Sequence, residues 1–260
     1  IVNETETKVF QQNQLTVKIY PTVQQMGKAA AQEVADRICN LLEGKAEINM
    51  IFAAAPSQEE FLHHLISDQR ISWNRINAFH MDEYIGVLPD APQSFGNFLR
   101  IRIFDKVPFK NVYYLNGHAT DLEEECTRYT SLLSQFPTDI VCLGIGENGH
   151  IAFNDPDVAN FNDHKLVKIV KLDHVCRQQQ VNEKCFETLE QVPTEALTLT
   201  IPALLKAKWM FCIVPFKNKS QAVYRTIHGD ISEKCPASIL RRKEKSSLYL
   251  DTESAQLLNL

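Results

Sequence analysis

The sequence predicts an α/β protein built on a doubly wound, mostly parallel sheet with helices on both faces. Segments typical of buried strands alternate with segments whose apolar residues recur at helical spacing, almost to the end of the chain. Such alternation indicates strand–helix–strand units, which place their strands in parallel. No linker, repeat or low-complexity stretch interrupts this order, so we expect one domain over residues 1–260.

The first half of the chain predicts a regular succession of strands and helices. Thr22 is expected to cap the first helix and Gly44 to end it. Residues 57–60 have the pattern of a capping box at the start of the second helix. The expected strands are 16–20, 48–55, 76–81 and 112–115, and the expected helices are 22–44, 57–66, 95–104 and 121–133.

The second half continues this order. The expected strands are 139–145, 165–172, 209–214 and 247–250, and the expected helices are 175–186, 218–227 and a short one that begins at Pro236. In open parallel sheets, ligands bind beyond the carboxyl ends of the strands. The candidate binding loops are therefore 53–57, 80–84, 144–155 and 215–219.

The segment 143–156 is the most informative part of the chain. An apolar run ends in three glycines within six residues, and His150 and Asp155 follow. Glycines let a backbone approach a ligand closely. Histidine titrates near neutral pH, and a carboxylate can orient it or change its pKa. The residues alone are equally compatible with a tight turn after a buried strand and a surface histidine.

Composition excludes several classes of function. The net charge of −5 argues against a nucleic-acid partner, although a local basic site for an anionic metabolite stays compatible with it. No apolar stretch reaches the roughly 20 residues that span a bilayer, so we expect no membrane partner. No signal peptide is visible, although a chain that starts at Ile1 leaves processing open.

Seven cysteines lie scattered without a CxxC spacing, which suits a reducing compartment and hence the cytoplasm. A catalytic thiol is the alternative reading, but no cysteine lies in a recognisable nucleophile motif.

Two motifs resemble those of the glucosamine-6-phosphate deaminase (isomerase) family. They are Phe79-His80-Met81-Asp82-Glu83-Tyr84-Ile85-Gly86 and the segment 143–156. The wider superfamily includes galactosamine-6-phosphate isomerases and 6-phosphogluconolactonases. Further matches extend the resemblance from Lys18 to Leu250. The ending Asn154-Asp155-Pro156 favours the deaminase branch over the lactonases.

The resemblance implies a modified doubly wound, Rossmann-like domain that binds a small-molecule sugar phosphate. Family members convert an aldose 2-amino-6-phosphate into the ketose phosphate and ammonia. The resemblance thus implies a cytoplasmic enzyme of amino-sugar metabolism and N-acetylglucosamine catabolism, classed as an isomerase and a hydrolase. It implies no cofactor and no metal. Family members are monomers or hexamers, so a homo-oligomer is compatible with it.

The motif match also assigns roles to residues. Asp82 falls on the general base that moves a proton between C2 and C1, and His150 on the histidine that assists ring opening. Asp155 falls on the partner of that histidine, Asn148 on a further member of the relay, and Lys219 on a phosphate-binding lysine. The remaining expected substrate-binding residues are Ala54, Ala55, Ser57, Glu83, Tyr84, Gly146, Gly149, Arg177 and Gln180.

The chain departs from the family pattern at three places. The phosphate loop, usually rich in glycine, threonine and serine, is Phe52-Ala53-Ala54-Ala55-Pro56-Ser57 here. A phosphate-binding arginine falls at Gln180, with Arg177 about one helical turn away as a substitute. A family aspartate is Asn148, as in some galactosamine-6-phosphate isomerases.

Two alternative functions follow from these departures. One is an isomerase or lactonase for another sugar phosphate, and the other is a sugar-phosphate sensor that has lost turnover. A metal site formed by His80, Asp82 and His150 is a further alternative.

Overall fold

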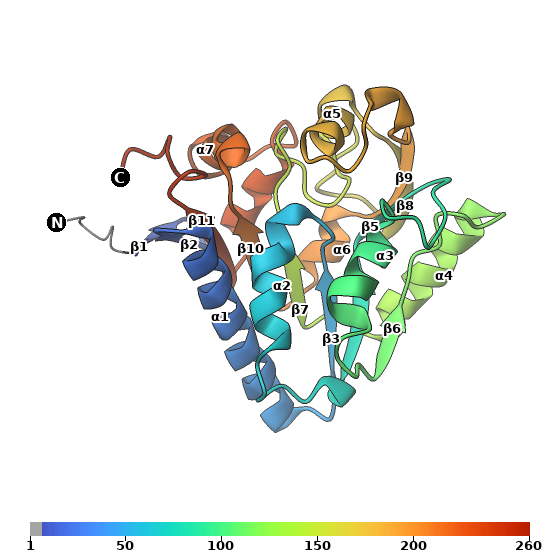
Figure 1. The fold of residues 1–260 in the computed structure, drawn as a ribbon, viewed down its shortest axis with the longest axis horizontal. Coiled ribbons are helices and arrows are strands. Elements are labelled where there is room, and N and C mark those ends of the chain that lie inside the picture. Colours follow the sequence, from blue (N-terminus) through green and yellow to red (C-terminus); the bar gives the residue numbers. More distant parts are fainter. Residues whose placement is uncertain (1–6) are drawn as a thin grey trace.

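A computed structural model describes residues 7–260 of the chain (Figure 1). Its main sheet has eight strands in the order β1-β2-β11-β10-β7-β3-β4-β6. All neighbouring pairs are parallel except β1 and β2. The strands are β1 (Lys8–Gln12), β2 (Leu15–Tyr20), β3 (Ile48–Phe52), β4 (Ile76–His80), β6 (Asn111–Tyr113), β7 (Ile140–Leu143), β10 (Trp209–Val214) and β11 (Ser246–Asp251).

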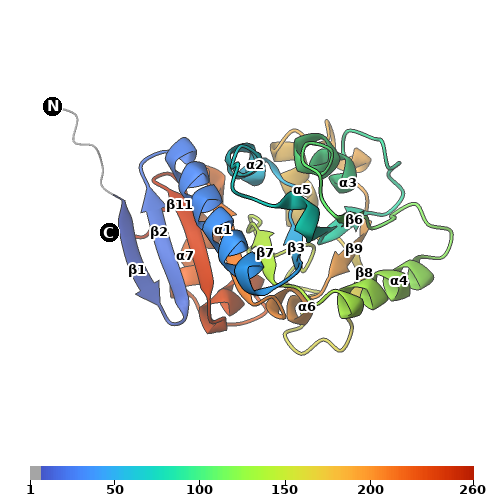
Figure 2. The same cartoon turned by 90° about the horizontal axis from the view of Figure 1, so that it is seen from below.

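Helices cover both faces of this sheet (Figure 2), which confirms the predicted fold class. Met50 and Phe52 of β3 pack into the apolar core on one face, whereas Ile51 packs into the core on the other. This split follows from the alternation of side chains along a strand. The first core contains α1 (Val23–Gly44), α2 (Glu59–Ile66) and α3 (Phe95–Leu99), and the second contains α4 (Leu122–Gln135), α6 (Ile201–Leu205) and α7 (Ser220–His228).

Helix α1 shows how local sequence positions these layers. The Thr22 side chain accepts a hydrogen bond from the Gln25 amide at 3.1 Å, so the predicted cap is present. Buried residues recur at four-residue spacing along one face of the helix, at Met26, Ala30, Val34 and Ile38. No helix among residues 7–260 is long and apolar enough to cross a membrane.

The order of the strands reverses between β3 and β7. From β3 the chain moves outward to β4 and β6, and it then returns to the other side of β3 and continues through β7, β10 and β11. Reversal points of this kind are where ligands bind in open α/β sheets. The Gln58 amide joins two strands there, because its Nε2 donates to the carbonyls of Leu143 at 3.3 Å and Ile213 at 3.2 Å.

A second, antiparallel sheet was not anticipated from the sequence. It contains β5 (Asp82–Tyr84), β9 (Glu195–Leu199) and β8 (Val167–Lys171) in that order. The predicted strand 165–172 therefore pairs outside the parallel sheet, because β9 supplies an antiparallel partner. Sequence patterns also missed β1, the three-residue β5, β9 and α6.

The predicted capping box at residues 57–60 is wrong. A 3₁₀ turn (Pro56–Gln58) precedes α2, and no side chain caps either helix start. The Ser57 hydroxyl instead accepts a hydrogen bond from the Gln58 side chain at 3.1 Å. Because the turn already carries the chain into the helix, Ser57 lies too early to serve as its cap.

Candidate active site

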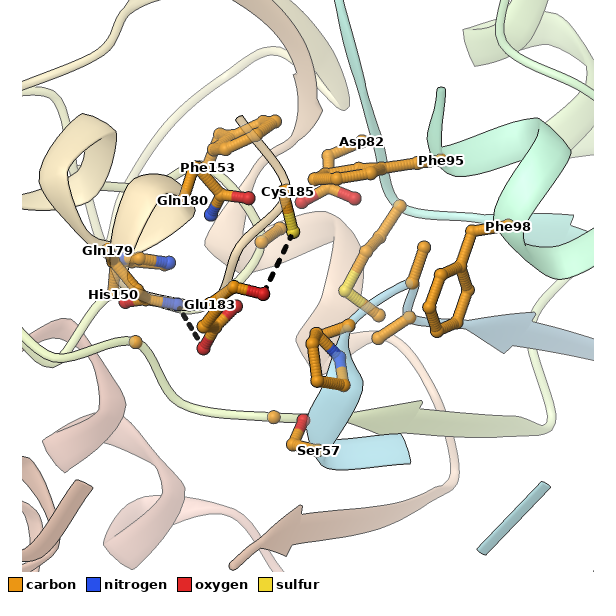
Figure 3. A pocket seen from close by; sticks show the side chains of 18 of the residues that line it. Ser57, Asp82, Phe95, Phe98, His150, Phe153, Gln179, Gln180, Glu183 and Cys185 are labelled. Atoms are coloured by element: carbon orange, nitrogen blue, oxygen red, sulfur yellow. Dashed lines mark hydrogen bonds between the residues drawn. The ribbon is translucent and has the colours of Figure 1, made fainter. Parts of the chain in front are cut away.

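A cavity of about 370 Å³ lies at the carboxyl edge of the main sheet. All four strand ends that the sequence singled out contribute to its wall, together with α5 (His174–Asn182) and the residues that follow it. Figure 3 shows Asp82 and His150 on separate walls of this cavity. Of the expected site residues, the cavity is lined by Ala54, Ala55, Ser57, Asp82, Gly146, His150, Gln180 and Lys219.

Asp82 is a buried carboxyl group at the cavity wall. It begins β5 and pairs with Thr198 of β9, which fixes its backbone. Its carboxylate accepts no hydrogen bond from the described residues, so its oxygens are available to a ligand. Burial, and secondly the charge of Glu83, raise the pKa of Asp82 well above its ordinary value. A carboxyl group held in this way is suited to take up a proton during a reaction.

His80 holds the backbone beside Asp82 in place. Its Nε2 accepts from the Leu115 amide at 3.0 Å, so Nδ1 carries the hydrogen and donates to the Asp82 carbonyl at 3.0 Å. Burial lowers the pKa of His80 to about 4, and the ring is therefore neutral at physiological pH. Because both ring nitrogens are engaged, the alternative of a metal site that includes His80 is wrong.

Glu83 was expected to bind substrate, but its side chain turns away from the cavity. Its carboxylate accepts hydrogen bonds from the Tyr84, Phe95 and Gly96 amides and from the Ser94 hydroxyl, all between 2.9 and 3.0 Å. Three of these donors lie at the amino end of α3, where a negative charge is favourable. Successive side chains of a strand point to opposite faces, so Glu83 cannot face the cavity beside Asp82.

Tyr84 was also expected to contact substrate, and it does not line the cavity. Its side chain is fully buried among Phe95, Phe153 and Phe186, with ring centroids 4.8 to 5.4 Å away. Tyr84 thus belongs to the apolar core that supports the cavity.

His150 is held by the glycine-rich turn after β7. Its Nδ1 lies 2.6 Å from the Asn148 Oδ1, and the His150 amide donates to the same oxygen at 3.0 Å. The ring packs so closely on Gly146 that a Cβ at residue 146 would overlap it. Glycine is therefore required at that position. Burial, and secondly the charge of Lys219, lower the pKa of His150 to about 4.

Asn148 links the histidine to two carboxylates. Its Nδ2 donates to Asp155 at 3.1 Å and to Asp173 at 2.8 Å, which fixes the orientation of the amide. The Asn148 oxygen then accepts the Nδ1 hydrogen of His150, leaving Nε2 unprotonated. Asp155, the expected partner, lies 3.3 Å from Nδ1. Asn148 and Asp155 lie behind the histidine ring and outside the cavity lining.

Gly149, another expected binding residue, has a structural role instead. Its φ is +84°, a conformation that side chains rarely adopt. A Cβ there would lie 2.7 Å from the Cys235 sulfur, and the residue does not line the cavity.

The end of the cavity at which a phosphate is expected to bind contains Lys219, Glu183 and Gln180. Lys219 is buried and forms an ion pair with Glu183 at 3.0 Å. Gln180 lines the cavity, but Arg177 does not and cannot replace the family arginine. Its guanidinium donates to the carbonyls of Leu189 and Val192 at 2.8 and 3.0 Å, which directs it away from the cavity.

Three side chains of this site were missed by the sequence analysis: Asp173, Gln179 and Glu183. Asp173 caps α5 by accepting from the Cys176 amide at 2.6 Å. An aspartate directly before a helical segment is a known cap signal and could have been recognised. Gln179 and Glu183 are polar residues on a polar helix, and their roles depend on tertiary contacts alone.

One side-chain group among residues 7–260 has donor atoms spaced for a metal. The ligand atoms of His150, Asp155 and Cys176 lie within 4.8 Å of one another. His150 and Asp155 already bond to Asn148, however. Burial also raises the pKa of the Cys176 thiol well above its ordinary value, which disfavours the thiolate that binds metals. We therefore assign no metal to this group.

The fold and this cavity define an α/β enzyme-like protein with a buried carboxyl group, a neutral histidine and a buried lysine at the carboxyl edge of its sheet. Residues 21–249 match the model of the glucosamine-6-phosphate isomerases/6-phosphogluconolactonase family. The chain belongs to this family.

Individual relatives agree with the family match. A glucosamine-6-phosphate deaminase of Listeria innocua is 36% identical over 212 residues, which cover 82% of this chain and 88% of that protein. One of Bacillus cereus is 39% identical over 188 residues, which cover 72% and 70%. The expectation of a hydrolase is wrong, because these relatives are named glucosamine-6-phosphate deaminases, which supports a deaminase/isomerase.

Solved structures share the fold. A monomeric glucosamine-6-phosphate deaminase has a TM-score of 0.83 at 32% identity and covers 93% of this chain and 99% of its own. A 6-phosphogluconolactonase from Thermotoga maritima has a TM-score of 0.74, with 91% and 99% covered. Its identity of 21% means that this second likeness concerns the fold alone.

Proposed function

We propose that the chain catalyses the isomerisation of an amino-sugar phosphate together with its deamination. The substrates would be water and glucosamine-6-phosphate or galactosamine-6-phosphate, and the products a ketose 6-phosphate, whose C2 oxygen comes from the water, and ammonia. The single observation that carries this proposal is the buried carboxyl group of Asp82, which has no hydrogen-bond donor among the described residues and faces the same cavity as His150. The deaminases among the relatives support the same reaction class.

Asp82 is the proposed base. Moving a proton from C2 to C1 of the open-chain sugar needs one group that accepts the proton and returns it to the neighbouring carbon. A positioned base contributes about 10²–10⁴-fold to such a step. The raised pKa makes the Asp82 carboxylate a stronger base, so it holds the transferred proton more readily.

His150 is proposed to assist opening of the sugar ring. With Nδ1–H bonded to Asn148, the unprotonated Nε2 can take a proton from a sugar hydroxyl and return it to the ring oxygen. Asn148 and Asp155 would position the ring. The carboxylates of Asp155 and Asp173 fix the Asn148 amide and thereby the histidine tautomer.

Lys219 is proposed to bind the phosphate, because it is a buried cation in the cavity lining. Gln180 and Ser57 offer neutral donors on the same lining. Ala54 and Ala55 offer only backbone groups to a ligand. The phosphate would therefore depend on fewer side chains than in a loop rich in hydroxyl groups.

Ammonia release tests the proposal. The purified protein is incubated separately with each of the two amino-sugar phosphates, with Asp82→Asn as the inactive variant and Glu187→Gln, on an exposed acidic residue outside the cavity lining, as the matched control. We expect ammonia from at least one sugar, its loss in Asp82→Asn and its retention in the control. Absence of ammonia with both sugars, or full activity of Asp82→Asn, would contradict the proposal.

We also propose a cytoplasmic location and no nucleic-acid partner. All seven cysteines are free thiols, which suits a reducing compartment.

The oligomeric state is a separate question. Light scattering would decide between a monomer, as the solved relative is described, and a homo-oligomer.

A further inference from the structure

The ion pair between Lys219 and Glu183 lies at the cavity end where the phosphate is proposed to bind. Lys219 follows β10, and Glu183 follows α5, so the pair joins two distant segments of the chain. Their side chains are only 3% and 9% exposed. A carboxylate is an acceptor of hydrogen bonds from an ammonium group, as a phosphate is, so both would use the same donor.

No other buried cation of the cavity lining is available to an anion. The Arg102 side chain is 33% exposed, so it is not a buried cation, and it is paired with Glu59 at 2.7 Å. The pKa of His150 is about 4, so its ring is neutral at physiological pH. Lys184 lines the cavity but is exposed to solvent. Among the described lining residues, Lys219 is therefore the only buried cation that a phosphate could use, and Glu183 already holds it.

The loop at residues 53–57 adds few side-chain donors for a phosphate. Ala53, Ala54 and Ala55 contribute no hydroxyl groups. The Ser57 hydroxyl accepts a hydrogen bond from Gln58, and its O–H is the only side-chain donor that this loop offers to a phosphate. A phosphate bound to Lys219 at this end of the cavity would thus lie beside the Glu183 carboxylate, and two negative charges would compete for one ammonium group.

We propose that Glu183 is an internal competitor for the substrate's phosphate, which holds Lys219 before binding and leaves it when the phosphate binds. This inference rests on the proposed function, because it concerns the phosphate of that substrate. It makes Glu183 a specificity-determining residue that lowers affinity for all weakly held anions and admits only a ligand whose remaining contacts offset its displacement.

The surroundings of Glu183 allow such a displacement. Its carboxylate also accepts from the Gln179 side chain at 3.1 Å, so it keeps one partner after leaving Lys219. Gln179 in turn accepts from the Glu147 amide at 2.7 Å, which ties this part of α5 to the glycine-rich turn. Glu183 itself lines the cavity, so a carboxylate that leaves Lys219 stays at the cavity surface, which limits the cost of an unpaired charge.

Binding of inorganic phosphate at pH 8, measured by calorimetry, tests the inference without any turnover. We expect Glu183→Gln to bind phosphate about tenfold or more tightly than the unaltered protein, because hydrogen bonds to charged groups act on that scale. Lys219→Met should abolish the binding in either background. Glu187→Gln is the matched control in the same segment, and it should bind phosphate as the unaltered protein does.

A second variant keeps the test informative if Glu183→Gln folds poorly. Glu183→Asp retains the charge but is one methylene shorter, so it reaches Lys219 less well and should also strengthen phosphate binding. Equal or weaker phosphate binding in a folded Glu183 variant, or no phosphate binding in any of them, would overturn the inference. Because calorimetry needs no reaction, tighter binding without ammonia release would sustain the inference while the proposed activity fails.

Discussion

Two sets of one histidine and one carboxylate lie at or beside the cavity, and they differ in how fully they are bonded. We call each set a pair, although no hydrogen bond joins its two members. In the first pair, His80 and Glu83, both ring nitrogens and both carboxylate oxygens have partners in the chain. In the second, His150 is bonded to the chain through Nδ1 alone, and the Asp82 carboxylate has no donor among the described residues. Burial is similar in both pairs, so burial alone does not mark a reactive group. The distinguishing feature is an unused donor or acceptor that faces the cavity.

The largest expected effect is on catalytic activity, and it distinguishes Asp82 from Glu83. Asp82→Asn should lower kcat by about 10²–10⁴-fold, because it removes the proposed base. The same variant should be at least as stable as the unaltered protein at neutral pH. A carboxyl group whose folded pKa is raised is least favourable above its ordinary pKa, and the amide removes that cost. Steady-state kinetics and thermal melting test this, and a less stable Asp82→Asn would place Asp82 with the structural pair.

The next effect is a loss of stability at low pH, which depends on His80 and His150. Burial lowers the pKa of both from 6.5 to about 4. Their contribution to stability is therefore complete above pH 6.5 and is lost as the pH falls toward 4, by an amount on the order of 3 kcal/mol for each ring. Urea unfolding between pH 7 and pH 4 should give a flatter profile for His80→Asn. An unchanged slope in that variant would mean that His80 is not held neutral by the fold.

The loss of stability expected from Glu83→Ala is about half of the loss expected in acid from the two histidine rings together. The variant leaves the amino end of α3 without its carboxylate acceptor, and about 3 kcal/mol of unfolding free energy should be lost. The exposed Glu124→Ala serves as the control and should differ little. Wild-type stability of Glu83→Ala in urea would show that its hydrogen bonds are replaced by water without cost.

The smallest expected effect is that of the Glu83 charge on the pKa of Asp82. The charge of Glu83 is the second cause, after burial, of the raised pKa of Asp82. Glu83→Gln keeps the size of the side chain and removes the charge. The acid limb of the kcat/KM profile should therefore move to lower pH. A shift to higher pH, or none, would show that Glu83 does not act on Asp82 through its charge.

Much of the fold could be predicted from the sequence because strong periodic patterns mark its elements. The helix from Thr22 to Gly44 and the strand 209–214 are in the structure as expected. The three-residue β5 and the pairing of β8 with β9 could not be predicted, since neither short strands nor antiparallel partners leave a pattern in one segment. The predicted strand 48–55 is too long, because Ala53 and Ala54, which follow β3, are buried without belonging to it.

The position of the candidate site could be predicted from the sequence, whereas the orientation of its side chains could be predicted less well. The strand ends that carry Asp82, His150 and Lys219 could be located from the sequence, because parallel strands bring their carboxyl ends to one edge. The direction in which a side chain points could not be located in this way. Glu83, Tyr84 and Arg177 face away from the cavity. Glu183 was missed because no local sequence pattern indicates an ion pair with Lys219, which lies 36 positions further along the chain.

The Gln58 amide has a consequence for the cavity as a whole. One nitrogen donates to the ends of β7 and β10 and to the Ser57 hydroxyl of the loop that follows β3. A side chain outside the cavity lining thus ties the ends of β7 and β10 to the loop that leads into α2. The segments that carry His150 and Lys219 follow these two strand ends, so Gln58 supports both from below the cavity. A redesign of residues 53–56 that kept Ser57 and Gln58 would change what the cavity recognises and retain this link.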